Sequence, residues 1–130
     1  MDRIRKKYEN SMRGLNKLLE LQDIKTVESD VFRDALIQRF EFTFEMIWKL
    51  LKAYMEDQGI QDINAPKAVL KEAYAQNLID HEDVWISMLK DRNLTSHIYS
   101  EAVAVRISKD IIVSYIPLFE KLLNMLEAKI

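Results

Sequence analysis

The sequence predicts an all-α protein, an antiparallel up-down bundle of about four to five helices that dimerises. Its 130 residues suit one domain, residues 1–130, and are enough to bury a hydrophobic core without disulfides or metal. Two glycines and two prolines are too few for the many turns of a β-sandwich or barrel. Apolar residues recur at steps of three or four, and no segment alternates with a period of two for long enough to indicate a sheet.

The composition excludes several kinds of protein. Because there is no cysteine, a disulfide framework, a zinc–thiolate site and a cysteine nucleophile are all excluded. The first residues are charged and no apolar segment follows them, so we expect no signal peptide. No apolar run approaches the roughly 20 residues that span a bilayer. We therefore expect a cytoplasmic protein that does not bind membranes.

The net charge is -2, from 19 basic and 21 acidic residues. This balance argues against a protein that binds nucleic acid over a broad basic surface, although it leaves room for a local phosphate site. A short basic cluster stands at the start of the chain. We interpret the cluster as the solvated face of a helix, and the alternative is an arm that contacts nucleic acid. Its members are Arg3, Arg5, Lys6 and Lys7.

The first amphipathic helix is predicted over residues 2–23, followed by a connector at residues 24–28. A long second helix should begin at a cap on Ser29 or Asp30 and stop at Gly59. Its core stripe is Phe32, Leu36, Phe40, Phe44, Ile47, Leu51, Tyr54 and Met55. A further set, Phe42, Met46 and Trp48, lies off that stripe. We interpret the surplus as a subunit interface, with a wider intramolecular core as the alternative.

Three more helices should follow. Pro66 suits the first turn of a short helix that Asn77 can close. Asp80 is expected to cap the next helix in the manner of a capping box. Ser100 should cap the last long helix, which Pro117 should kink because it lacks a backbone donor.

No metal or cofactor site is predicted. His81 has no second nitrogen or sulfur ligand near it, so we expect an exposed polar residue. Glu41 and Glu45 stand one helical turn apart and could hold a cation. However, Lys49 lies one turn beyond Glu45 and no third ligand is evident, which favours structural ion pairing.

A polar segment in the second half of the chain gathers groups that suit RNA chemistry. Arg92 can hold a phosphate in bidentate fashion, and His97 can move a proton near pH 7. Asn93, Ser96 and Tyr99 add an amide, a hydroxyl and a phenol. In metal-independent cleavage, the histidine would activate a ribose 2′-OH and the arginine would stabilise charge on the phosphorus centre.

Helical spacing constrains how these groups can meet. Arg92 and His97 are five positions apart, which places them roughly 140° around an ideal helix. They can converge only if the helix unwinds or a second subunit completes the site. One histidine cannot be acid and base at once, and this also favours a composite two-fold site. The alternative is a polar network that ties the last two helices together.

Two segments resemble a known family. Arg92, His97 and Tyr99 fit the Arg-x4-His-x-Tyr motif of HEPN-domain proteins. Residues 39–45 (RFEFTFE), followed by Trp48-Lys49, resemble one HEPN subgroup, the nucleotidyltransferase substrate-binding proteins. The resemblance covers most of the chain after about Asp30 and is strengthened by Trp85, Met88, Leu89 and residues 91–97. One departure is Ala65, where related sequences tend to have a serine before the helix-starting proline.

The resemblance implies a dimerising bundle with a separately encoded minimal nucleotidyltransferase as its partner. In some HEPN members the motif arginine and histidine form the ribonuclease site of a toxin, and the partner is an antitoxin that transfers AMP to the motif tyrosine. Carried over, Arg92 and His97 would be catalytic, and Tyr99 would be the AMP acceptor. The substrate would be held by Arg92, Asn93, Ser96 and Tyr99. Phosphate on Tyr99 would oppose an incoming RNA phosphate.

Three functions fit these observations. The first is a non-catalytic module that binds a nucleotide or nucleic acid and presents it to the nucleotidyltransferase, and the subgroup resemblance favours it. The second is a metal-independent endoribonuclease toxin with a composite Arg92 and His97 site. The third is an assembly protein whose motif only braces the helices. The first two can coexist in one protein, and the chain is an enzyme if the second holds.

Overall fold

The computed structural model describes residues 2–95 and 100–130, and these residues contain helices and no strand. Because α5, η2 and α6 follow one another without a break, the described residues form five helical rods, and the predicted all-α bundle is confirmed. The elements are α1 (Asp2–Leu19), a 3-10 turn η1 (Ile24–Glu28), α2 (Asp30–Asp57), α3 (Pro66–Ala75), α4 (Glu82–Thr95), α5 (Glu101–Asp110), a π-helical turn η2 (Ile111–Tyr115) and α6 (Ile116–Glu127).

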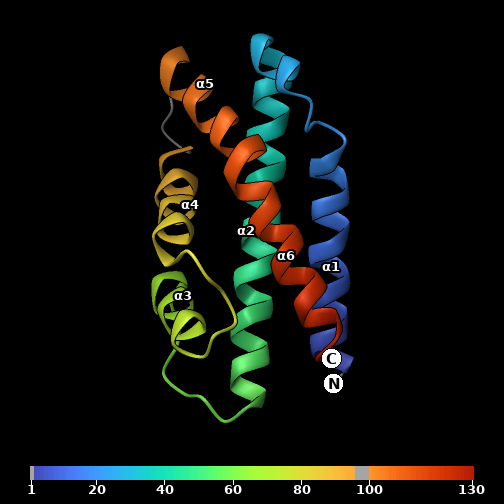
Figure 1. Ribbon diagram of the computed structural model, residues 1–130, viewed down its shortest axis with the longest axis vertical. Coiled ribbons are helices and arrows are strands. Elements are labelled where there is room, and N and C mark those ends of the chain that lie inside the picture. Colours follow the sequence, from blue (N-terminus) through green and yellow to red (C-terminus); the bar gives the residue numbers. More distant parts are fainter. Residues whose placement is uncertain (1, 96–99) are drawn as a thin grey trace.

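The five rods stand as four columns. Figure 1 shows α1 and α2 side by side, α3 and α4 stacked end to end as a third column, and α5 to α6 crossing in front as the fourth. The two chain ends meet at one end of the bundle. There Arg5 donates a hydrogen bond to the carbonyl of Ile130 at 3.0 Å, and the Tyr8 hydroxyl donates to Glu127 at 2.8 Å. These bonds join α1 to α6.

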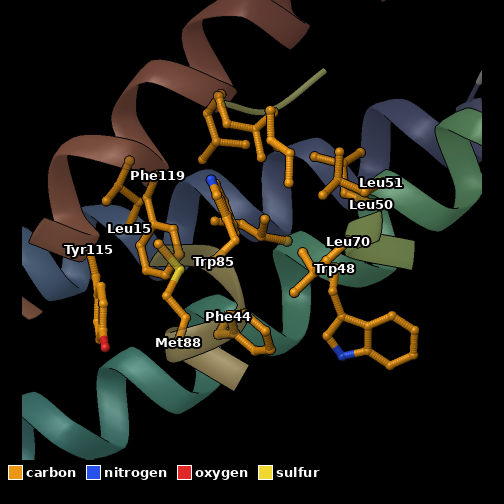
Figure 2. Packing of buried hydrophobic residues seen from close by; sticks show 14 of the residues in the cluster. Leu15, Phe44, Trp48, Leu50, Leu51, Leu70, Trp85, Met88, Tyr115 and Phe119 are labelled. Carbon is orange, nitrogen blue, oxygen red and sulfur yellow. The ribbon is translucent and has the colours of Figure 1, made fainter. Parts of the chain in front are cut away.

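The core is built around α2, which has 28 residues. Phe40 and Phe44 of α2 are fully buried, and Phe40 stacks on Tyr115 with ring centroids 5.4 Å apart. Phe119 of α6 lies 6.1 Å from Phe40 and 5.8 Å from Trp85 of α4. Figure 2 shows the rings of Phe44, Trp85, Tyr115 and Phe119 gathered between the helices. Aromatic side chains bury large areas, so this cluster fixes how α2, α4 and α6 pack.

The three apolar residues of α2 that lie off its core stripe, Phe42, Met46 and Trp48, are only partly at the surface. Trp48 is 9% exposed and belongs to the core, so the prediction that it forms a subunit interface is wrong for this residue. Met46 is half-buried, and Phe42 is 49% exposed. Phe32, which we expected in the core stripe, is 50% exposed. Its neighbour Arg33 takes the inward position in the first turn of α2, and Phe32 therefore points elsewhere.

The first helix is shorter than predicted, ending at Leu19 rather than near residue 23. The reason lies on α2, where Arg39 donates a hydrogen bond to the carbonyl of Lys17 at 2.7 Å. The next turn tightens, because the N–H of Leu21 bonds to the carbonyl of Leu18 at 3.0 Å instead of continuing the α pattern.

The predicted helix ends are confirmed in most places. Ser29 caps α2 by accepting a hydrogen bond from the N–H of Phe32. Gly59 and Asn77 follow α2 and α3 with φ of 93° and 60°, the left-handed conformation that closes a helix. Ala65 precedes Pro66 with an extended backbone and makes no side-chain cap, as its lack of a hydroxyl requires.

The predicted start of α4 is wrong. The helix begins at Glu82, and the carbonyl of His81 accepts the hydrogen bond from the N–H of Val84. Asp80 does not cap it but pairs with Lys121 of α6, and the hydrogen bond from Lys121 holds the pKa of Asp80 below its usual value. His81 is exposed, as expected.

The last long helix passes Pro117 through an irregular turn. Just before this proline the π-helical turn η2 carries the chain from α5 into α6, and the N–H of Ile116 bonds to the carbonyl of Ile111. Because proline has no backbone N–H, one hydrogen bond of the helix is missing at Pro117. The wider π-helical turn accommodates this gap, so the helix continues rather than ending. None of the described helices is long and apolar enough to cross a membrane.

The Tyr8–Glu127 contact should make the protein less stable in alkali. Burial, and then the hydrogen bond and charge of Glu127, raise the pKa of Tyr8 from 10.0 to about 12. Between these values the unfolded chain loses a phenol proton that the folded chain keeps. The free energy of unfolding should therefore fall by up to about 1.4 kcal/mol per pH unit from this residue. Urea unfolding of the wild type and of Tyr8→Phe between pH 10 and about pH 12 measures this loss. If the free energy of unfolding falls with pH equally in both proteins, the prediction is wrong.

Candidate functional site

The polar segment lies where α4 ends and α5 begins. Arg92 and Asn93 occupy the last turn of α4. Ser96, His97 and Tyr99 lie outside the described residues. The expectation that Arg92 and His97 converge is therefore not tested by the structure, and the description of the site rests on its α4 half and on the elements that hold it.

Arg92 is ion-paired across to α2. Its Nη2 donates to the carboxylate of Glu45, and its Nη1 donates to Oδ1 of Asn93 at 3.2 Å. Lys49, one turn along α2, lies 3.6 Å from the other oxygen of Glu45. The ion pairing predicted for Glu45 and Lys49 is confirmed, and Arg92 is a partner that helical spacing could not reveal. The Arg92 side chain is 31% exposed, so its guanidinium is not sealed inside the bundle.

The charges at this point favour an anion. Two cations, Arg92 and Lys49, pair with the same carboxylate, that of Glu45. Arg92 stands in the last turn of α4, where the carbonyl end of the helix stabilises the positive charge of the guanidinium but does not itself attract an anion. A phosphate that approached could take the place of Glu45 on the guanidinium, because arginine binds carboxylate and phosphate with the same geometry.

The residue before Arg92 anchors α4 to the last column. Asp91 is 5% exposed, and Arg106 of α5 donates two hydrogen bonds to its carboxylate at 3.1 and 3.2 Å. The hydroxyl of Tyr115 donates a third at 2.5 Å. Burial and this bond raise the pKa of Tyr115 well above its usual value, so it stays a donor. Arg106 also bonds to Asp110 at 3.0 Å.

A second anchor holds the chain on the far side of the motif. Arg33 of α2 is buried and donates to the carbonyl of Val27 at 2.6 Å and to the carboxylate of Glu101 at 3.2 Å. Glu101 is the first residue of α5, directly after the cap Ser100, whose side chain accepts from the N–H of Val103. The motif is thus bracketed by Asp91 before it and Glu101 after it.

Sequence reasoning missed most of these supports. Tyr115 stands 24 positions from Asp91, so its hydroxyl gave no local signal of this contact. Arg33 and Arg106 each stand many positions from their acidic partners, so no helical spacing joins them. Asp91 was part of the family resemblance but carried no predicted role. Among the described residues no three histidine, aspartate or glutamate side chains gather closely enough to hold a metal ion.

Comparison with known proteins places the whole chain in one family. The family described as "Nucleotidyltransferase substrate binding protein like" matches residues 3–128. A curated relative, "Probable ribonuclease HepT" of Haemophilus influenzae, is 31% identical over 86 residues, which cover 63% of this chain. The match spans 59% of that relative's length.

Solved structures share the fold. A protein of Thermus thermophilus is 36% identical, with a TM-score of 0.80 over 89% of this chain and 98% of that one. A tri-AMPylated Shewanella oneidensis HEPN toxin in complex with MNT antitoxin has a TM-score of 0.81 at 18% identity, covering 98% of both chains. A toxin–antitoxin structure with AMP-PNP gives 0.81 at 17% identity, over 98% of this chain and 99% of that one. At these last two identities the likeness is one of fold.

The Asp91 anchor should contribute more to stability than the other carboxylate on Arg106. Asp91→Ala leaves the buried Tyr115 hydroxyl without an acceptor and should lower the free energy of unfolding by about 3 kcal/mol. Asp110→Ala removes a surface pair to the same guanidinium and should cost less than about 1 kcal/mol. Urea unfolding of both variants checks the ranking, and equal losses would show that burial does not set the value of this contact.

Proposed function

This chain belongs to the nucleotidyltransferase substrate-binding protein-like family of the HEPN superfamily, and on that premise we propose that it is the substrate-binding partner of a minimal nucleotidyltransferase. Its ligand is a nucleotide or nucleic acid, held through phosphate at the end of α4. The partner is a separate nucleotidyltransferase chain, in keeping with the toxin–antitoxin complexes that have this fold. We also propose that residues 1–130 act as one domain and that two copies associate.

The ion pair of Arg92 with Glu45 carries this proposal. A partly exposed arginine whose partner is a carboxylate can accept a phosphate in its place as soon as the carboxylate moves. Lys49 on the same carboxylate adds a second cation for the ligand. Asn93, beside Arg92, supplies an amide to a ribose or base. Ser96 and Tyr99 complete the proposed set of substrate contacts.

Binding of ATP to the purified protein tests the role of Arg92. Arg92→Ala should weaken binding about 10- to 150-fold, the range for losing hydrogen bonds to a charged group. Glu45→Gln should strengthen binding, because it removes the competing charge while keeping the shape. Lys90→Ala, an exposed lysine of the same helix, is the matched control and should change little. Titration calorimetry measures all four proteins. Equal affinities for Arg92→Ala and the control would contradict the proposal.

A second candidate function is a metal-independent endoribonuclease, favoured by the match to "Probable ribonuclease HepT" and by the complete Arg-x4-His-x-Tyr motif. In this reaction His97 would remove the proton of a ribose 2′-OH, whose oxygen attacks the adjacent phosphorus. Arg92 would stabilise the charge on that phosphate. The 5′-oxygen would leave with a proton from the His97 of a second copy. AMP transferred to Tyr99 would then block RNA beside Arg92.

Mixed subunits test whether two copies build this composite site. Arg92→Ala and His97→Ala should each lower RNA cleavage in chelator by about 100- to 10,000-fold. Mixed dimers of the wild type with His97→Ala should be as inactive as His97→Ala itself, because the reaction needs one histidine from each copy. Mixed dimers of the wild type with Lys90→Ala are the control and should stay active. Light scattering gives the number of subunits; a fully active monomer would contradict the composite site. If the protein binds ATP but cleaves no RNA, only the first function, substrate binding, is supported.

A further inference from the structure

The surface between α1 and α2 carries a row of cations, most of which lie outside the proposed site at the end of α4. We call it the α1–α2 seam. One hollow in the seam, of about 440 Å³, is lined by Arg3, Lys7, Lys49, Lys52 and Trp48, with Glu56 as the one acidic residue. A second hollow, of about 390 Å³, is lined by Arg13, Lys17 and Arg39, with Gly14 and Phe42. The first hollow thus has four cations and the second has three, on a protein whose net charge is -2.

The carboxylates that offset these cations are few and solvent-exposed or half-buried. Glu56 lies 3.3 Å from Arg3, and Glu20 is shared by Lys17 at 3.7 Å and Arg39 at 3.3 Å. Such surface pairs stabilise a protein by only about 0–1 kcal/mol, so a phosphate can displace them. In the part of the chain that the structure describes, Lys7 and Lys52 have no carboxylate within 4.0 Å.

Phe42 stands in the middle of this row with 49% of its surface exposed. Its ring lies over Gly14 of α1, where a Cβ would come within 3.1 and 3.2 Å of two ring carbons. A side chain at position 14 would therefore push the ring away. An aromatic ring supported from below and open above, with cations on both sides, is the arrangement on which proteins stack the bases of single strands.

Trp48 gives a second indication of a ligand. Its indole is at the edge of the core, turned away from Phe44 and Trp85 in Figure 2. Its N–H is buried and has no acceptor among the described residues, although it belongs to a residue that lines the first hollow. Buried donors are almost always paired, so an oxygen of a ligand in the hollow would satisfy this N–H if the indole turned toward it on binding.

We propose that the α1–α2 seam binds the sugar–phosphate chain of a single-stranded polynucleotide, with one base stacked on Phe42. The seam joins the motif, because Lys49 shares Glu45 with Arg92 and Lys52 is one turn further along the same face of α2. A second copy of this chain is a poorer occupant, since self-association through the seam would bring like charges together. This inference rests on the proposed function in taking the ligand as nucleic acid, and it narrows that ligand to a strand longer than one nucleotide.

Fluorescence anisotropy with labelled oligo(dT) of about 12 nucleotides tests the seam. This strand has no 2′-OH and cannot be cleaved, so binding is measured apart from any reaction. Lys7→Ala with Lys52→Ala should lower the slope of log affinity against log salt by about 1.4, or about 0.7 for each lost phosphate contact. Lys67→Ala with Lys71→Ala, two exposed lysines of α3, is the matched control and should leave the slope unchanged.

Phe42 is tested in the same assay. Phe42→Ala should weaken binding about 5- to 160-fold, whereas Phe42→Tyr keeps a stacking face and should bind like the wild type. Phe32→Ala removes an equally exposed ring elsewhere on α2 and should have no effect. Circular dichroism confirms that each variant is folded.

Three outcomes overturn the inference, and a fourth overturns only the proposed function. If the α3 control lowers the slope as much as the seam pair, the binding is nonspecific attraction. If Phe42→Ala instead converts a dimer into a monomer without changing affinity for oligo(dT), the seam is a contact between copies. If Arg92→Ala loses ATP binding but the seam variants bind oligo(dT) like the wild type, this inference is wrong and the proposed function stands. If the seam variants lose oligo(dT) binding while Arg92→Ala still binds ATP, the seam inference stands and the proposed role of Arg92 fails.

Discussion

The buried carboxylate of Asp91 fixes the geometry on which the candidate site depends. Three hydrogen bonds from Arg106 and Tyr115 hold it against the last column of the bundle. Because successive residues on a helix are about 100° apart, an Asp91 that faces this column turns Arg92 toward α2. There Glu45 receives the guanidinium. The buried Asp91 thus sets the direction in which Arg92 points. Because the two side chains face different helices, neither residue could take the role of the other.

The long helix α2 serves both the core and the surface that bears the charges. Its inward face carries Phe40 and Phe44, which pack against the other columns. Its outward face carries Glu45 and Lys49, and further along Lys52, at helical spacing. A helix that is rigidly packed on one side keeps the groups on its other side at fixed distances. The candidate anion site therefore stands on a frame that binding need not reorganise.

Two arginines near the motif, Arg92 and Arg33, each form an ion pair with a glutamate. Glu45 is the partner of Arg92 and also of Lys49, and Glu101 is the partner of Arg33. Arg33 differs, because it is buried and bonded to a backbone carbonyl as well, so its role is structural. Solvent access distinguishes the two arginines. Arg92 is partly exposed and can exchange Glu45 for a phosphate, whereas the buried Arg33 has to keep its partners.

The sequence by itself determined the helical class, the ends of α2 and α3, the ion pair of Glu45 with Lys49, and the family, because these depend on residues a few positions apart or on a run of side chains in order. It misplaced the end of α1 and the cap of α4, where Arg39 and Lys121 reach across from other helices. The tertiary structure alone decided that Arg92 meets Glu45 and that Asp91 is buried. Such contacts join residues tens of positions apart, and helical periodicity carries no information about which columns pack together.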